Sequence, residues 1–129
     1  MFGLGDTAML PKPGHEREHL WALITAPDPQ SGEAVMVNLT TQRPHSDTTT
    51  ILQSGEHPFV DRPTVVFYAD ARVVNVSTLE GGLRQGFVRQ HAALSPQVLQ
   101  RIQSGLLTSP FTPEKVKAAF NAARQKGLA

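Results

Sequence analysis

Residues 20–25 read Leu-Trp-Ala-Leu-Ile-Thr, and residues 34–40 read Ala-Val-Met-Val-Asn-Leu-Thr. Both runs are short and mostly apolar, and the stretch between them contains the turn-forming residues Pro27 and Gly32. Short apolar runs bounded by turn residues are typical of buried β-strands. In the second run every other residue is valine or leucine, which is the period-two pattern of a strand. The sequence therefore predicts two strands joined as a hairpin.

Three further strands are expected downstream of this hairpin. Residues 48–52 are rich in β-branched side chains, and residues 64–68 contain a fully apolar run that fits a buried strand. Between these two strands, Pro58 and Pro63 exclude a helix, so a long loop is expected. Residues 71–76 are expected to form another strand, which pairs beside the preceding one.

The pattern changes at Ser95-Pro96, where a capping residue precedes a proline that is tolerated in a first helical turn. Apolar residues then recur at helical spacing, and either Ser104-Gly105 or Pro110 is expected to end this helix. Thr112-Pro113 begins a second expected helix, which ends before Gly127. The predicted fold class is α+β and mainly β, with a small antiparallel β-barrel followed by two C-terminal helices.

Composition limits the domain organisation and the class of protein. The chain has 129 residues and no cysteine, so it fits a single core without disulfides or thiolate metal sites. No apolar stretch approaches the roughly 18 residues that span a bilayer, and no secretory signal is recognisable. We expect a soluble cytoplasmic protein with a lead-in at residues 1–18, a barrel at 19–92 and a helical segment at 93–129.

Charge is distributed unevenly along the chain. Residues 1–80 carry five basic and ten acidic side chains, a net charge of −5, whereas residues 81–129 carry seven basic and one acidic side chain, a net charge of +6. The basic segment could neutralise phosphates of a nucleic acid. Alternatively, it is an ordinary surface that compensates the acidic barrel.

The order of elements resembles that of the PemK/MazF-like family of toxins. The resemblance covers residues 17–76 and includes the second strand, which ends in Asn-Leu-Thr-Thr at 38–41, and the segment Asp-Ala-Arg-Val-Val at 70–74. It implies an SH3-like barrel, a toxin-antitoxin function, and metal-independent, sequence-preferring cleavage of single-stranded RNA without a cofactor. It also implies a homodimer that is inhibited by an acidic antitoxin-like protein lying across the active face.

The resemblance further implies that catalysis uses an arginine together with a threonine or serine. The threonine corresponds best to Thr41, with Thr40 beside it. The position before the first strand holds His19, and Arg17 lies two residues earlier. Either His19 is the acid/base or the arginine function has been lost or moved to Arg17. An unperturbed histidine has a pKa of about 6.5 and can serve as both base and acid near neutrality.

Arg43, His57 and Arg72, together with Thr40, are the candidate RNA-binding residues. His57 follows Glu56 in a proline-bounded loop, which forms either a catalytic or recognition loop or a turn in which the backbone holds His57 and Phe59 enters the core. Arg72 contacts phosphate or pairs with a neighbouring aspartate. The histidines are spaced too irregularly to indicate a metal site.

Two readings without catalysis remain open. The barrel could be a non-catalytic module that binds protein or nucleic acid, or the helices could form an arm that covers the open edge of the barrel. Burial of the apolar stripes on the two helices would distinguish these readings.

Overall fold

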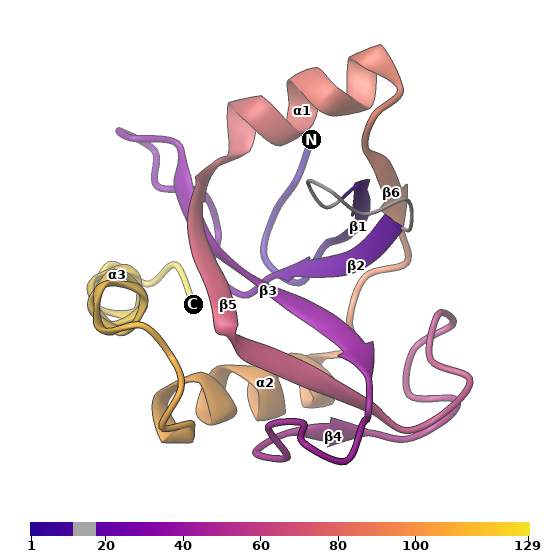
Figure 1. Cartoon of the computed structure of the whole chain (residues 1–129). Coiled ribbons are helices and arrows are strands. Elements are labelled where there is room, and N and C mark those ends of the chain that lie inside the picture. The colour runs from indigo at the N-terminus through magenta and orange to yellow at the C-terminus, as the bar shows by residue number, and fades with distance from the viewer. Residues whose placement is uncertain (12–17) are drawn as a thin grey trace.

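The computed structural model describes residues 1–11 and 18–129. It has an α+β fold in which a curled sheet of six antiparallel strands is combined with three helices (Figure 1). The strand order is β4-β5-β3-β2-β1-β6. Within the described residues, no helix is both long enough and apolar enough to cross a membrane.

The predicted hairpin lies at the centre of the sheet. β2 (Glu18–Leu23) pairs antiparallel with β3 (Glu33–Thr41), in a register that places Leu20 opposite Leu39. Six consecutive residues of β3 are buried, because both faces of this strand are covered. The strand therefore contributes alternate side chains to two separate cores.

The N-terminal segment differs from the expected lead-in. Thr7–Pro11 form β1, which lies between β2 and β6 (Arg89–His91) and pairs with both. The side chain of Phe2 is buried in one of the cores. The segment contributes a strand in which Thr7, Ala8 and Met9 are buried, where the sequence analysis expected only a lead-in over residues 1–18.

β5 is a single strand of twelve residues, Thr64–Asn75, where the sequence predicted two strands beside each other. Both halves pair with β3, but the register shifts between Asn38, which is opposite Phe67, and Met36, which is opposite Arg72. The extra residues of β5 form a bulge that bends the strand. The neighbouring strand β4 is limited to Ile51–Leu52, at the end of the range expected for it.

A helix that the sequence analysis did not predict, α1 (Val76–Gln85), lies between β5 and β6. The side chain of Asn75 caps its start by accepting a hydrogen bond from the Ser77 N–H, and Gly86 ends it with a φ of 83°. Val76 and Leu79 bury the inner side of α1 against one face of the sheet. Figure 1 shows α1 above the sheet and α2 below it.

The other face of the sheet is covered by α2 (Pro96–Thr108) and α3 (Glu114–Gln125). Ser95 caps α2 by accepting a hydrogen bond from the Val98 N–H. Their apolar side chains enter the larger core, so neither helix is a detached arm; the buried ones are Val98, Ile102, Leu106, Val116 and Phe120.

Gly105 lies inside α2 and does not end it. A Cβ at this position would lie 2.1 Å from the hydroxyl oxygens of both Thr50 and Tyr68. These hydroxyls are 2.7 Å apart, and the Tyr68 hydroxyl donates to the Ile102 carbonyl. The glycine therefore allows the helix to approach a buried group of hydroxyls closely.

Candidate functional site

One face of the sheet brings together side chains from β2, β3 and β5. The register aligns Trp21, Asn38 and Phe67 in one row across the three strands. Side chains two residues apart on a strand share a face, so His19 lies on the side of Trp21 and Thr40 on the side of Asn38. His19 and Thr40 are partly exposed, and Phe67 is 39% exposed. This surface, here called the row face, continues beyond the part of the sheet that α1 covers.

Arg72 joins the row face from the other side of the β5 bulge. Its guanidinium carbon lies 5.1 Å from the centroid of the Trp21 ring, within the range of a cation–π interaction. The same group donates a 2.9 Å hydrogen bond to a carboxylate oxygen of Asp70. These two interactions hold the positively charged guanidinium of Arg72 beside the Trp21 ring of the row face.

Asn38 is the polar member in the middle of the row. Its side chain is 1% exposed, and its Oδ1 atom is buried without a hydrogen bond to any described residue. Buried acceptors of this kind are uncommon in folded proteins and occur at functional positions. The sequence pattern placed Asn38 on a strand but gave no indication that its Oδ1 would be buried without a hydrogen bond to a described residue.

A cavity of about 260 Å³ opens where β3 ends. Phe67 and Val65 contribute apolar surface to it, and the turn after β3 contributes polar groups. That turn is held by two hydrogen bonds, from the Arg43 N–H to the Ser46 hydroxyl at 2.7 Å and from the Ser46 N–H to the Arg43 carbonyl at 3.1 Å. The remaining lining residues are Thr40, Thr41, His45 and Asp47.

Thr41 and Thr40 lie on different faces. Thr41 pairs with Thr64 in the register and follows Thr40 directly, so its side chain points to the face opposite His19. Thr41 reaches the cavity at its edge, whereas Thr40 belongs to the row face. Of the two adjacent threonines, Thr40 is the one whose hydroxyl is on the same face as His19. The other catalytic candidate, Arg17, lies outside the described residues.

His57 is separate from this surface. It is 3% exposed, its Nε2 lies 2.6 Å from the Ala92 carbonyl oxygen, and its Nδ1 accepts a 3.0 Å hydrogen bond from the Phe59 N–H. Burial lowers its pKa, the hydrogen bond to Ala92 opposes this effect, and the neighbouring His91 adds to it. The arrangement matches the backbone-held turn among the two alternatives for this loop. Phe59 differs from that alternative, because it is 38% exposed and the adjacent Val60 is buried instead.

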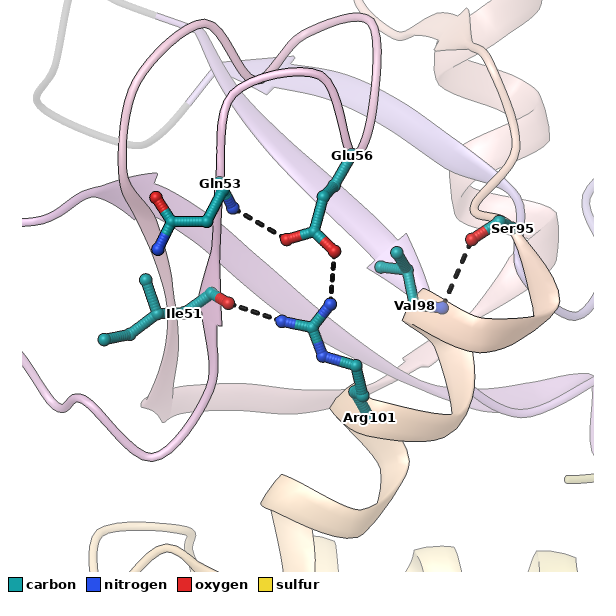
Figure 2. A network of polar contacts seen from close by, with 6 residues as sticks. All are labelled: Ile51, Gln53, Glu56, Ser95, Val98 and Arg101. Atoms are coloured by element: carbon teal, nitrogen blue, oxygen red, sulfur yellow. Dashed lines mark hydrogen bonds and ion pairs between the residues drawn. The ribbon is translucent and has the colours of Figure 1, made fainter.

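A polar network fastens the loop that carries Gln53 and Glu56 to Arg101 of α2, as Figure 2 shows. Arg101 pairs with Glu56 and donates a 2.6 Å hydrogen bond to the Ile51 carbonyl. Glu56 accepts a 2.7 Å hydrogen bond from the Gln53 N–H. The backbone and Arg101 hydrogen bonds lower the pKa of Glu56, which favours its charged form. A cavity of about 410 Å³ lies beside this network, between β4 and α2.

The basic C-terminal segment compensates acidic side chains of the first 80 residues. Arg89 pairs with Glu18, Arg101 with Glu56, and Lys126 with Asp28 at 2.7 Å. The Lys126 hydrogen bond is the main reason that the pKa of Asp28 falls to about 2. These pairs favour internal charge compensation over a dedicated phosphate-binding surface on the helices.

Phe67 is the feature of this surface that the sequence analysis missed most clearly. The run Val65-Val66-Phe67 indicated a strand buried on both faces, yet the Phe67 side chain is substantially exposed.

Among the described residues, no group of three or more histidine, aspartate or glutamate side chains is arranged to hold a metal ion. No model of a known protein family matches the sequence, and no curated protein matches it.

Proposed function

We propose that the chain is a PemK/MazF-like endoribonuclease that binds single-stranded RNA on the row face and cleaves it without a metal. The observation that carries the proposal is the presence of His19, Thr40 and Arg72 on one face with Phe67. An acid/base group, a hydroxyl and a cation are the parts that such a reaction uses, and an exposed aromatic ring can stack a base of a single strand. The curled antiparallel sheet is compatible with an SH3-like barrel.

The reaction is an attack of the ribose 2′-oxygen on the adjacent phosphorus. His19 takes the 2′-hydroxyl proton as the 2′-oxygen to phosphorus bond forms, and the bond to the 5′-oxygen breaks. A water molecule protonates the departing 5′-oxygen, and the proton held by His19 neutralises the hydroxide left behind, which gives a 5′-hydroxyl end and a 2′,3′-cyclic phosphate. Arg72 stabilises the negative charge that develops on the phosphoryl oxygens, and the Thr40 hydroxyl hydrogen-bonds the same group. The family resemblance adds a homodimer and an acidic antitoxin-like partner to the proposal.

The test is cleavage of a long single-stranded RNA in the presence of EDTA. We expect defined cleavage sites, and a loss of rate of about 10²-fold or more in His19→Ala, as is typical for removal of a general acid/base. Thr40→Ala is expected to lose more activity than Thr41→Ala, because only Thr40 shares a face with His19. His91→Ala is the matched histidine control, since His91 lies on the edge strand β6, and it should cleave like the wild type.

A second candidate function is RNA binding without cleavage. It is favoured by the existing interactions of Arg72 with Asp70 and Trp21, which already engage the charge that catalysis would need. An RNA with 2′-O-methyl groups cannot be cleaved by this chemistry and reports binding alone. Binding of this RNA, combined with cleavage of ordinary RNA that is absent or equal in all variants, would support the binding module. Failure to bind either RNA would refute both functions.

A further inference from the structure

We infer that the cavity between Phe67 and the Arg43–Ser46 turn is a subsite for one nucleotide, with the base against Phe67 and the phosphate at Arg43 and His45. The inference rests on the proposed function, because it identifies where RNA next to the cleavage position would be held. It adds a binding determinant for the substrate that the catalytic proposal does not require.

The size and the floor of the cavity fit a single base. Its volume of about 260 Å³ lies just below the range of about 300–1,000 Å³ that holds drug-sized ligands, which suits a group as small as one base. Phe67 presents an aromatic ring that is 39% exposed, and the buried Val65 extends the apolar floor. Base stacking on an aromatic side chain is tolerant of sequence and contributes substantially to binding of single strands.

The rim of the cavity supplies an arginine, a histidine and hydroxyl groups. Arg43 and His45 are exposed, and hydrogen bonds to Ser46 fix the turn that carries them. Within residues 1–11 and 18–129, neither the Arg43 guanidinium nor the Thr40 hydroxyl has a hydrogen-bond partner or an ion pair. An arginine in this state can bind a phosphate, and the Thr40 hydroxyl, which the proposed reaction places on the scissile phosphate, connects the subsite to the cleavage position.

The carboxylate of Asp47 sets the orientation of the nucleotide. Asp47 also lines the cavity, and it accepts hydrogen bonds from the Thr49 hydroxyl and the Ser109 hydroxyl, both at 2.6 Å. Burial raises the pKa of Asp47, but these hydrogen bonds outweigh burial and lower it overall, so the group is negatively charged. A phosphate is repelled from this wall, which leaves the Arg43 and His45 side as its place.

The experiment is an NMR titration of the full chain with the four nucleoside 3′-monophosphates, beside binding of a 2′-O-methyl RNA nonamer. Mononucleotides are expected to shift amide signals of residues 40–47 and 65–67. Phe67→Leu keeps an apolar side chain but removes the ring, and it should weaken nonamer binding roughly 5- to 100-fold, which corresponds to the loss of one stacked base. Phe87→Leu is the matched control, because Phe87 is 65% exposed and follows α1 at a different place in the fold.

Arg43→Gln is a second variant that leaves the floor of the cavity intact, and it should abolish the mononucleotide shifts at 40–47. If the nonamer binds but mononucleotides shift no amide in these two segments, the subsite is refuted and the proposed function stands. If Phe67→Leu binds the nonamer as tightly as Phe87→Leu does, the subsite is likewise refuted. If mononucleotides produce the shifts but RNA is neither bound nor cleaved, the subsite stands and the proposed function fails.

Discussion

Acidification should destabilise this protein through His57. The Nδ1 atom accepts a hydrogen bond from the Phe59 N–H, so in the neutral ring the proton is on Nε2 and is donated to the Ala92 carbonyl. Protonation of Nδ1 would place two hydrogens face to face and break the contact with Phe59. The loop would then lose the internal hydrogen bond that fixes the His57 ring against its own backbone, while the Nε2–H donation to Ala92 remains.

Proton linkage gives the sign and the upper limit of the change in the free energy of unfolding with pH. In the unfolded chain His57 takes up a proton near pH 6.5, whereas burial lowers its pKa in the folded protein. Between these two values the unfolded state holds the extra proton, so the free energy of unfolding falls as the pH falls. Above pH 6.5 the ring is neutral in both states, so His57 no longer lowers the free energy of unfolding. One proton sets a limit of about 1.4 kcal/mol per pH unit.

Urea unfolding at pH 7.5 and at pH 5.5 measures this effect. His57→Gln keeps a donor for Ala92 but does not titrate. The loss in the free energy of unfolding that this substitution causes, relative to the wild type, should therefore be smaller at pH 5.5 than at pH 7.5, by up to about 1.4 kcal/mol. Thr7→Val is the control, because the Thr7 hydroxyl donates to the same carbonyl at 2.6 Å and does not titrate in this range. Its deficit should be equal at both pH values. A deficit of His57→Gln that also stays constant would refute the assigned tautomer and the argument from burial.

Two further substitutions test the packing of the fold. Gly105→Ala places a Cβ 2.1 Å from the Tyr68 hydroxyl and should lower the free energy of unfolding by about 1–3 kcal/mol or more. Gly81→Ala in α1 meets no atom closer than 3.8 Å and should raise the free energy of unfolding by up to about 1 kcal/mol. Equal effects of the two substitutions in thermal or urea unfolding would contradict this difference. Thr25→Val removes the hydroxyl that accepts a 2.9 Å hydrogen bond from the buried Val35 N–H, and it should cost about 1–3 kcal/mol in the same assay, with a neutral result showing that another acceptor replaces it.

Local sequence signals predicted the elements whose cause is local. The β2–β3 hairpin is present because two apolar runs flank a proline and glycine turn, and α2 starts after Ser95 because the serine caps it. β1 and α1 were missed because glycines or prolines lie in or beside them, and because tertiary burial of Phe2 and Leu79 outweighs those local preferences.

The candidate site was harder to predict than the fold, because strand register decides it. A shift of one residue moves a side chain to the other face of a sheet, so the choice between Thr40 and Thr41 depends on the pairing of β3 with β5. That pairing is interrupted by the β5 bulge, which no residue pattern in the strand indicated. For the same reason, the exposure of Phe67 and the position of Arg72 against Trp21 could not be derived from alternation alone.

The pairing of β1 with β6 affects how the chain can fold during its synthesis. β1 leaves the ribosome first among the strands, but its outer neighbour β6 emerges last, after α1. Until Arg89–His91 are available, a nascent chain that already contains β1 to β5 carries an open strand edge, which can recruit other chains. The outer edge of β1 is therefore paired only after the other strands of the sheet have been synthesised.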